Sequence, residues 1–365
     1  MNSALLTRIA SRLMRRPAAP YFEHSVRDEV EAICRENSLR FQEDVFGNVL
    51  VRLQTATRLR PLALAAHMDH PGFEVVAERR STAIKVRFHG GVPDAWFRIG
   101  TPIRLMPGGI KAKLGRRIGK EKAFEIQCKQ SLKERPAFAV WELPDFEIRE
   151  GRIHGRSCDD LIGVASILAT IIELKRTQAR ANVIGIISRA EEVGFYGALA
   201  LTTGRNLPQN ALVVSLETSR ELPGAKMGEG VILRVGDRTS IFDSEATRFL
   251  GEIATQLQAG TKRFQFQRAL MSGGTCEATA YQEFGFQSAA ICVALGNYHN
   301  CARDNRIRAE FVSVADAVSM IELLVAVVRD FGNYATYVKR LPKRLSRMRA
   351  EATVRLRPTA QLSSH

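Results

Sequence analysis

The feature that most constrains the fold is a short apolar run followed by two acids. Residues 182–187 read Asn-Val-Ile-Gly-Ile-Ile, a composition rich in β-branched residues that predicts a buried strand. Glu191 and Glu192 follow it. Ligands gather at the carboxyl ends of strands in open α/β sheets, and adjacent buried carboxylates repel each other unless a cation lies near them. The pair points to a metal site, although by itself it is better explained as a solvated turn.

A histidine stands at the end of a second predicted strand. Residues 62–66 are apolar, and His67 and Asp69 come directly after them. The carboxylate of Asp69 can accept a hydrogen bond from the imidazole nitrogen that faces away from a metal, which would fix the tautomer. The arrangement suits a metal ligand, but most isolated triplets of this kind bind nothing.

Three further candidate ligands occupy comparable places. Glu217 ends one predicted strand, and His299 follows another. Asp159 comes just before a long apolar helix predicted for residues 161–174, where an acid also suits the helix dipole.

The complete set contains imidazoles and carboxylates but no cysteine. Its members are His67, Asp159, Glu191, Glu192, Glu217 and His299. Such ligands suit catalytic zinc, cobalt or manganese better than a structural zinc. One metal needs about three protein ligands, so five ligands and a spare carboxylate fit two divalent ions ~3.5–4 Å apart. We expect two divalent metal ions per chain, with zinc first and cobalt or manganese as alternatives.

Strands and helices alternate outside one region, which predicts an α/β fold. The predicted strands are residues 49–53, 62–66, 182–187, 211–216 and 288–295. The predicted helices are residues 24–37, 161–174, 196–201, 244–257 and 312–331, with a further helix near the start of the chain.

The exception is residues 73–149, where short alternating segments are punctuated by glycine and proline. We interpret this region as a small β domain, inserted into an α/β domain formed by residues 1–72 and 150–337. Its basic stretch, residues 111–122, is interpreted as a solvated loop. Residues 338–365 are interpreted as a flexible basic tail.

The chain carries a formal net charge of +15, and part of that excess is local. Eight basic residues and a single acid lie between Lys339 and Arg357. Such a tail can contact nucleic acid or anionic lipid. A solvated extension is preferred, and no specific nucleic-acid partner is expected, because no recognisable nucleic-acid-binding motif accompanies the charge.

The six cysteines are scattered and form no Cys-x-x-Cys pair, which suggests reduced thiols and a cytoplasmic location. The longest mainly apolar stretch, residues 162–174, is shorter than the ~20 residues that a membrane-spanning helix needs. We therefore expect no membrane span. Four arginines near the start slightly resemble a transit peptide, but helical spacing of apolar residues favours a docked first helix.

The order of these motifs resembles the TET-type (glutamyl or deblocking) aminopeptidases, a family of dinuclear metallopeptidases. The resemblance covers roughly residues 1–335. The matching stretches are residues 44–48, 66–69, 90–91, 158–160, 191–194, 215–217, 273–275 and 298–299.

The resemblance implies a fold, an activity and a set of roles. The fold is a mixed-sheet, zinc-aminopeptidase-like α/β catalytic domain with an inserted small β-barrel. The activity is removal of N-terminal residues from peptides, by a dinuclear metal centre with a bridging water. The implied ligands are His67 and Glu217 for one metal, Glu192 and His299 for the other, and Asp159 as the bridge. Glu191 would be the general base, with Asp69 beside it in the catalytic set.

The resemblance also implies two structural features. The peptide bond after Asp159 would be cis. The inserted β domain would mediate self-association into dimers or larger assemblies.

The chain departs from the family at several positions. Glu217 replaces the usual Asp, Cys276 and Glu277 stand where Asp often follows Gly-Gly-Thr, and Leu161 replaces a polar residue. Two other functions stay open. A related dinuclear metal amidohydrolase or deacylase would use the same ligands but carry a βαβ-type lid. A basic binding protein without activity would not need the complete ligand set.

Overall fold

The computed structural model describes residues 3–80, 83–119, 121–128, 135–261 and 263–360. Its main sheet has the strand order β1-β2-β12-β3-β13-β16-β17-β11-β10, and β14 and β15 branch from β16. Four central strands run parallel: β12 (Asn182–Ser188), β3 (Leu62–His67), β13 (Leu212–Arg220) and β16 (Gln287–Gly296). Their carboxyl ends therefore meet at one edge of the sheet.

Antiparallel strands extend the sheet on both sides of this parallel centre. They are β1 (Arg40–Glu43), β2 (Val49–Gln54), β17 (Glu310–Ser313), β11 (Arg152–Gly155) and β10 (Glu147–Arg149). The branch consists of β14 (Val231–Gly236) and β15 (Phe266–Leu270). The sheet is mixed, as predicted.

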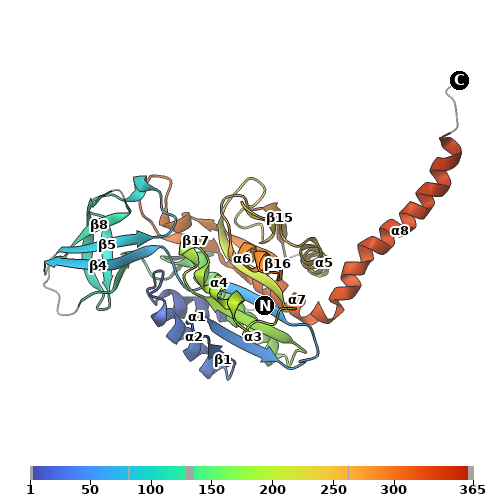
Figure 1. Ribbon diagram of the computed structural model, residues 1–365, viewed down its shortest axis with the longest axis horizontal. Helices are drawn as coiled ribbons and strands as arrows, with labels where there is room; N and C mark the ends of the chain where they lie inside the picture. Colours follow the sequence, from blue (N-terminus) through green and yellow to red (C-terminus); the bar gives the residue numbers. More distant parts are fainter. Residues whose placement is uncertain (1–2, 81–82, 120, 129–134, 262, 361–365) are drawn as a thin grey trace.

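Helices cover both faces of the sheet (Figure 1). The larger core contains residues of α1 (Ser3–Met14), α2 (His24–Glu36), α3 (Cys158–Arg176), α5 (Ser244–Gly260) and α7 (Val314–Asp330). The smaller core on the other face contains residues of α4 (Tyr196–Thr203) and α6 (Glu277–Glu283). In β3, Leu62 and Leu64 face the larger core, whereas Ala63 and Ala65 face the smaller one. This alternation follows from the two-residue period of a strand.

The inserted region forms a separate closed barrel of six antiparallel strands, seen at one end of the molecule in Figure 1. The strands are β4 (Gly72–Arg80), β5 (Ala83–His89), β6 (Pro102–Met106), β7 (Ile110–Arg117), β8 (Ala123–Cys128) and β9 (Phe138–Trp141). Its own core includes Phe73, Phe88, Phe124 and Trp141. The predicted α/β class with an inserted small β-barrel is confirmed, while the exact domain limits stay a prediction.

The interpretation of residues 111–122 as a solvated loop is wrong, because β7 occupies most of that stretch. Ala112 and Leu114 are buried in the barrel, whereas Lys111 and Lys113, which alternate with them, are exposed. Every second side chain of a barrel strand faces solvent, so a strand can carry as many charges as a loop. The sequence did not reveal this strand, because lysines and arginines separate its few apolar residues.

Residues Tyr334–Thr359 form a long helix, α8, where the sequence had suggested only a basic tail. Lysine, arginine, leucine, methionine and alanine dominate this stretch, and all are good helix formers. Within the described part of the chain, no helix combines the length and the hydropathy needed to cross a membrane.

Replacing Leu168 by alanine tests the packing of α3 against the sheet. Leu168 is completely buried in the larger core, so Leu168→Ala should lower the free energy of unfolding by ~2–5 kcal/mol. The matched control is Leu356→Ala, because Leu356 is 65% exposed and its loss should change stability by ~0.5 kcal/mol or less. Denaturant unfolding followed by circular dichroism measures both. Equal effects of the two changes would contradict this core.

Candidate metal centre

Two clusters of potential ligands lie at the carboxyl edge of the parallel strands. One contains His67, Glu191 and Glu217, and the other contains Asp159, Glu192 and His299. Within each cluster, the candidate ligand atoms lie within 4.8 Å of one another. The structure thus brings together all six residues that the sequence named.

Asp159 lies between the two clusters. Its Oδ1 is 3.6 Å from Nε2 of His67, and its Oδ2 is 3.6 Å from Nε2 of His299. Each histidine also has its own carboxylate neighbour: Glu191 lies 4.0 Å from Nε2 of His67, and Glu192 lies 3.2 Å from Nε2 of His299. Asp159 therefore presents one carboxylate oxygen to each histidine and connects the two clusters.

The strand register explains why these residues meet. His67 is the last residue of β3 and is paired with Ser188, the last residue of β12. Glu217 lies within β13 and is paired with Cys292 of β16. The sequence had predicted that Glu217 ends its strand, but the strand continues to Arg220 through its pairing with β16. Glu217 is therefore held by the sheet and not by a loop.

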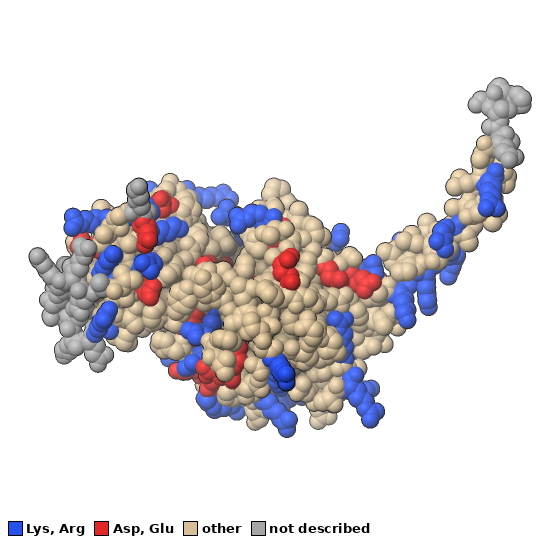
Figure 2. Space-filling view, viewed as in Figure 1, with Lys and Arg blue, Asp and Glu red and all other residues tan. Residues whose placement is uncertain are grey.

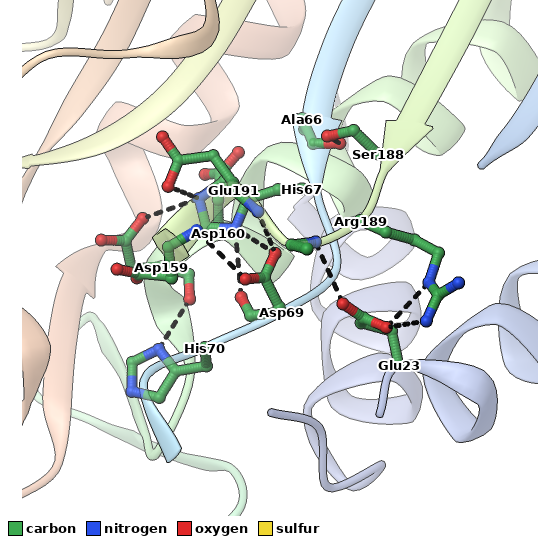
Figure 3. A network of polar contacts seen from close by, with 12 residues as sticks. Glu23, Ala66, His67, Asp69, His70, Asp159, Asp160, Ser188, Arg189 and Glu191 are labelled. Atoms are coloured by element: carbon green, nitrogen blue, oxygen red, sulfur yellow. Dashed lines mark hydrogen bonds and ion pairs between the residues drawn. The ribbon is translucent and has the colours of Figure 1, made fainter. Parts of the chain in front are cut away.

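The turn that carries the two glutamates is fastened by two buried carboxylates (Figure 3). Glu23 accepts a hydrogen bond from the backbone N–H of Ala190 at 3.0 Å and pairs with the Arg189 guanidinium. Asp69 accepts from the N–H groups of Glu191 and Glu192 at 2.9 and 3.1 Å. Ala190 has φ +51°, a left-handed conformation that costs energy in a non-glycine residue. These carboxylates help to hold the turn in that conformation.

The contacts of Asp69 differ from the simple pattern that the sequence suggested. Its carboxylate bonds the turn, whereas its backbone carbonyl lies 3.1 Å from Nδ1 of His67. The carboxylate oxygen is 3.5 Å from the same nitrogen. Asp69 thus orients the His67 ring largely through its main chain and positions Glu191 and Glu192 through its side chain.

The backbone of Asp159 is also held by buried groups. Its N–H donates to Glu310 at 3.0 Å, and its carbonyl lies 2.9 Å from Nδ1 of His70. The other ring nitrogen of His70 contacts Asn300 at 2.9 Å. The peptide bond between Asp159 and Asp160 is cis, so that expectation is confirmed.

The electrostatics of the site fit bound cations. Burial raises the pKa of Glu217 to about 8 and also raises that of Glu191. Burial opposes ionisation of Asp159, but His299 and His67 outweigh it and hold its pKa below the usual range. Oxygens of Asp159, Glu192 and Glu217 are buried without a hydrogen-bond partner among the described residues. Cations would supply both the missing partners and the missing positive charge.

A small pocket adjoins Glu217 and is lined by two arginines, Arg220 and Arg234. Arg234 is only 3% exposed, and it forms no ion pair with any residue that the structure describes. Its guanidinium donates a hydrogen bond to the Ser219 hydroxyl at 3.1 Å. Arg220 lies over the ring of Tyr298, which stacks on His299. A larger cavity of about 660 Å³ continues from Arg220 and Tyr298 toward Trp96.

Several supporting residues were not foreseen from the sequence. They are Glu23, His70, Arg234 and Glu310. Glu23 lies 167 residues from Ala190, and Glu310 lies 151 residues from Asp159, whose backbone N–H groups they bind. Glu277 was noted only as a departure, and it is fully buried, with a pKa that burial raises to about 7. Only His70 could have been suspected, because it belongs to the same strand-end motif as His67.

The fold is similar to that of several solved peptidases. The TET1 peptidase of Pyrococcus horikoshii is 19% identical, with a TM-score of 0.74 over 88% of this chain and 99% of that one. An aminopeptidase from Desulfurococcus kamchatkensis is 19% identical, with a TM-score of 0.74 over 90% of this chain and 95% of the other. A TET aminopeptidase from a marine sediment archaeon (Thaumarchaeota) is 19% identical, with a TM-score of 0.77 over 92% of this chain and all of the other.

A family model described as M42 glutamyl aminopeptidase matches residues 135–321, which is more than half of the chain. That region includes five of the six candidate ligands, and His67 joins them through the sheet. The predicted resemblance is therefore confirmed. The chain belongs to the M42 glutamyl aminopeptidase family, a family of metallo-aminopeptidases.

Proposed function

We propose that this chain removes N-terminal residues from peptides with a pair of divalent metal ions. The observation that carries the proposal is Asp159, whose two oxygens face two different histidines at 3.6 Å each. Each histidine has a second carboxylate close by. We assign zinc to both positions, with cobalt or manganese as the alternatives.

The chain's own residues divide the work as follows. His67 and Glu217 would hold one ion, Glu192 and His299 the other, and Asp159 both. Bound ions polarise the scissile carbonyl and acidify the attacking water. Glu191 would accept the proton of that water and deliver it to the leaving amine. Asp69 is a positioning residue, since it holds the N–H groups of both glutamates.

Glu191 and Glu192 should differ when each is changed to glutamine. Glu191→Gln keeps the size of the side chain but cannot accept a proton, so turnover should fall ~10²–10⁴-fold while both metals stay bound. Glu192→Gln should weaken one metal site, and some activity should return at high metal concentration. Metal analysis and hydrolysis of a peptide substrate, measured on both variants, test the assignment.

The results for these two variants also distinguish the general base from the metal ligand. Glu191 lies in the same cluster as His67 and Glu217, so a ligand role is the direct competitor. If Glu191→Gln loses metal and added metal restores its activity, Glu191 is the ligand and Glu192 the general base. A wild-type protein that binds no zinc, cobalt or manganese would contradict the dinuclear centre and favour the basic binding protein.

We also propose that the substrate's N-terminal side chain is acidic. When Glu217 binds a cation, its charge is committed to that cation, and the buried guanidinium of Arg234 then lacks a counter-charge in the adjoining pocket. A buried unpaired charge is unfavourable, and a substrate carboxylate would pair with it. The name of the family, glutamyl aminopeptidase, is consistent with this preference.

Arg234→Met should reduce this selectivity, because it removes the charge and keeps an unbranched side chain. The ratio of kcat/KM for an N-terminal glutamyl substrate to that for a leucyl substrate should fall about tenfold or more, as a charge-assisted hydrogen bond is lost. Arg248→Met is the matched control, since Arg248 lies in α5 and binds the Val338 carbonyl. An unchanged ratio in Arg234→Met would exclude the acidic pocket.

The inserted domain favours a peptidase over a deacylase. It is a closed barrel of six antiparallel strands, whereas a βαβ-type lid was the feature expected for the deacylases. We further propose that this barrel mediates self-association. The TET1 peptidase of Pyrococcus horikoshii can assemble into a tetrahedron or a large octahedral shell, which supports an assembly of this chain larger than a monomer.

Ile99 offers a test of that assembly. It is 77% exposed and lies beside β6 of the barrel. We expect the wild-type protein to exceed the monomer mass in light scattering, and Ile99→Asp to reduce that mass. Val45→Asp serves as the control, because Val45 is 92% exposed outside the barrel. A monomeric wild type, or equal masses for all three proteins, would contradict self-association through this surface.

A further inference from the structure

The C-terminal helix α8 leaves the body at the end opposite the barrel (Figure 1). Its first turns are anchored: Tyr337 is buried, and its hydroxyl contacts Gln256 and Asp330. Arg340 pairs with Glu252 of α5 at 2.8 Å. After Pro342, every described residue of the helix is exposed. A proline inside a helix removes a backbone hydrogen bond, and this one stands where the anchored and projecting parts meet.

The projecting part has an apolar stripe. Its members follow spacings of four, three, four and four residues, which places them on one side of the helix: Leu341, Leu345, Met348, Ala352 and Leu356. Leu345, Met348 and Leu356 are 50%, 53% and 65% exposed. A row of exposed large hydrophobic residues on one helix face indicates a surface that another apolar phase covers.

Basic side chains surround this stripe and also fill the opposite face. Lys and Arg gather along the helix in Figure 2. Arg340 is paired with Glu252. The other basic residues of the helix form no ion pair with a residue that the structure describes; they are Lys339, Lys343, Arg344, Arg347, Arg349, Arg355 and Arg357. Glu351 is the single acid among them. The helix therefore presents apolar and cationic surface together.

The charge argues against a second copy of this chain as the occupant. Two such helices would bring like charges together, and the rest of the chain also carries more basic than acidic residues. Nucleic acid would satisfy the charges but not the apolar stripe, because phosphate contacts bury little hydrocarbon. An anionic bilayer satisfies both, since lipid headgroups attract the cations and the acyl boundary receives the apolar face.

We propose that α8 is a membrane-surface helix that attaches this protein to anionic lipid. The stripe lies in the boundary between headgroups and acyl chains, and the flanking lysines and arginines contact lipid phosphates. The helix lies beyond residues 135–321, the region that the family model matches. Because α8 and the barrel lie at opposite ends of the molecule, membrane attachment through α8 would not cover the barrel surface proposed for self-association. In an assembly, several such helices would bind the same membrane and strengthen attachment.

Vesicle flotation of the full-length protein tests the proposal. The protein should float with vesicles that contain phosphatidylserine in phosphatidylcholine, and not with vesicles of phosphatidylcholine alone. High salt should release it, because headgroup attraction is screened. Two variants separate the contributions: Lys343→Glu with Arg347→Glu reverses charge, and Leu345→Ser with Met348→Ser removes the stripe. Each should weaken binding about tenfold or more.

The matched control is Arg58→Glu with Arg205→Glu, which changes the net charge equally but acts on exposed residues of the body. This control should bind vesicles like the wild type. Equal weakening by the control would reduce the effect to net charge and overturn the proposal. Failure of the wild type to float at low salt would also overturn it, as would binding to duplex DNA or RNA that loss of the apolar stripe leaves unchanged.

Discussion

The burial of like charges at one edge of the sheet is the constraint on which this site depends. Asp159, Glu191, Glu192 and Glu217 lie close together with little exposure to water, and the imidazoles of His67 and His299 stand among them. Such a cluster is unfavourable without added positive charge. Bound cations would therefore contribute to folding stability as well as to chemistry, since ligand deprotonation, binding and folding are linked.

The scaffold tolerates this charge because it fixes the backbone around it. The parallel pairing of β3 and β12 sets the position of His67 beside the glutamate turn. Glu23 and Asp69 then bind three successive N–H groups of that turn, and Glu310 binds the N–H of Asp159. Rigid support of this kind is what keeps reactive groups in a productive arrangement. The ligands are thus held by a second set of buried acids.

Two appendages lie at opposite ends of this catalytic body (Figure 1). The barrel has a hydrophobic core of its own, and Gly91 next to it approaches the His299 ring so closely that a Cβ there would lie 3.0 Å away. Trp96 also bonds the carbonyl of Ala302. The barrel is therefore attached beside the site, whereas α8 is attached through α5 on the helical side and projects away from it.

The sequence alone determined the α/β pattern, the inserted β region and the six candidate ligands. Apolar runs and the residues at their ends are local, so periodicity and strand-end position were sufficient to find them. It did not reveal β7, whose charged outer face hid its buried positions, or the extension of β13 beyond Glu217 to Arg220. Nor did it reveal the contacts of Glu23, Glu310 and Arg234, because each depends on residues distant in the chain. Only the tertiary structure decides which carboxylate can bind a metal and which holds the backbone of a turn. Both kinds are buried acids, and they differ only in the groups that surround them in space.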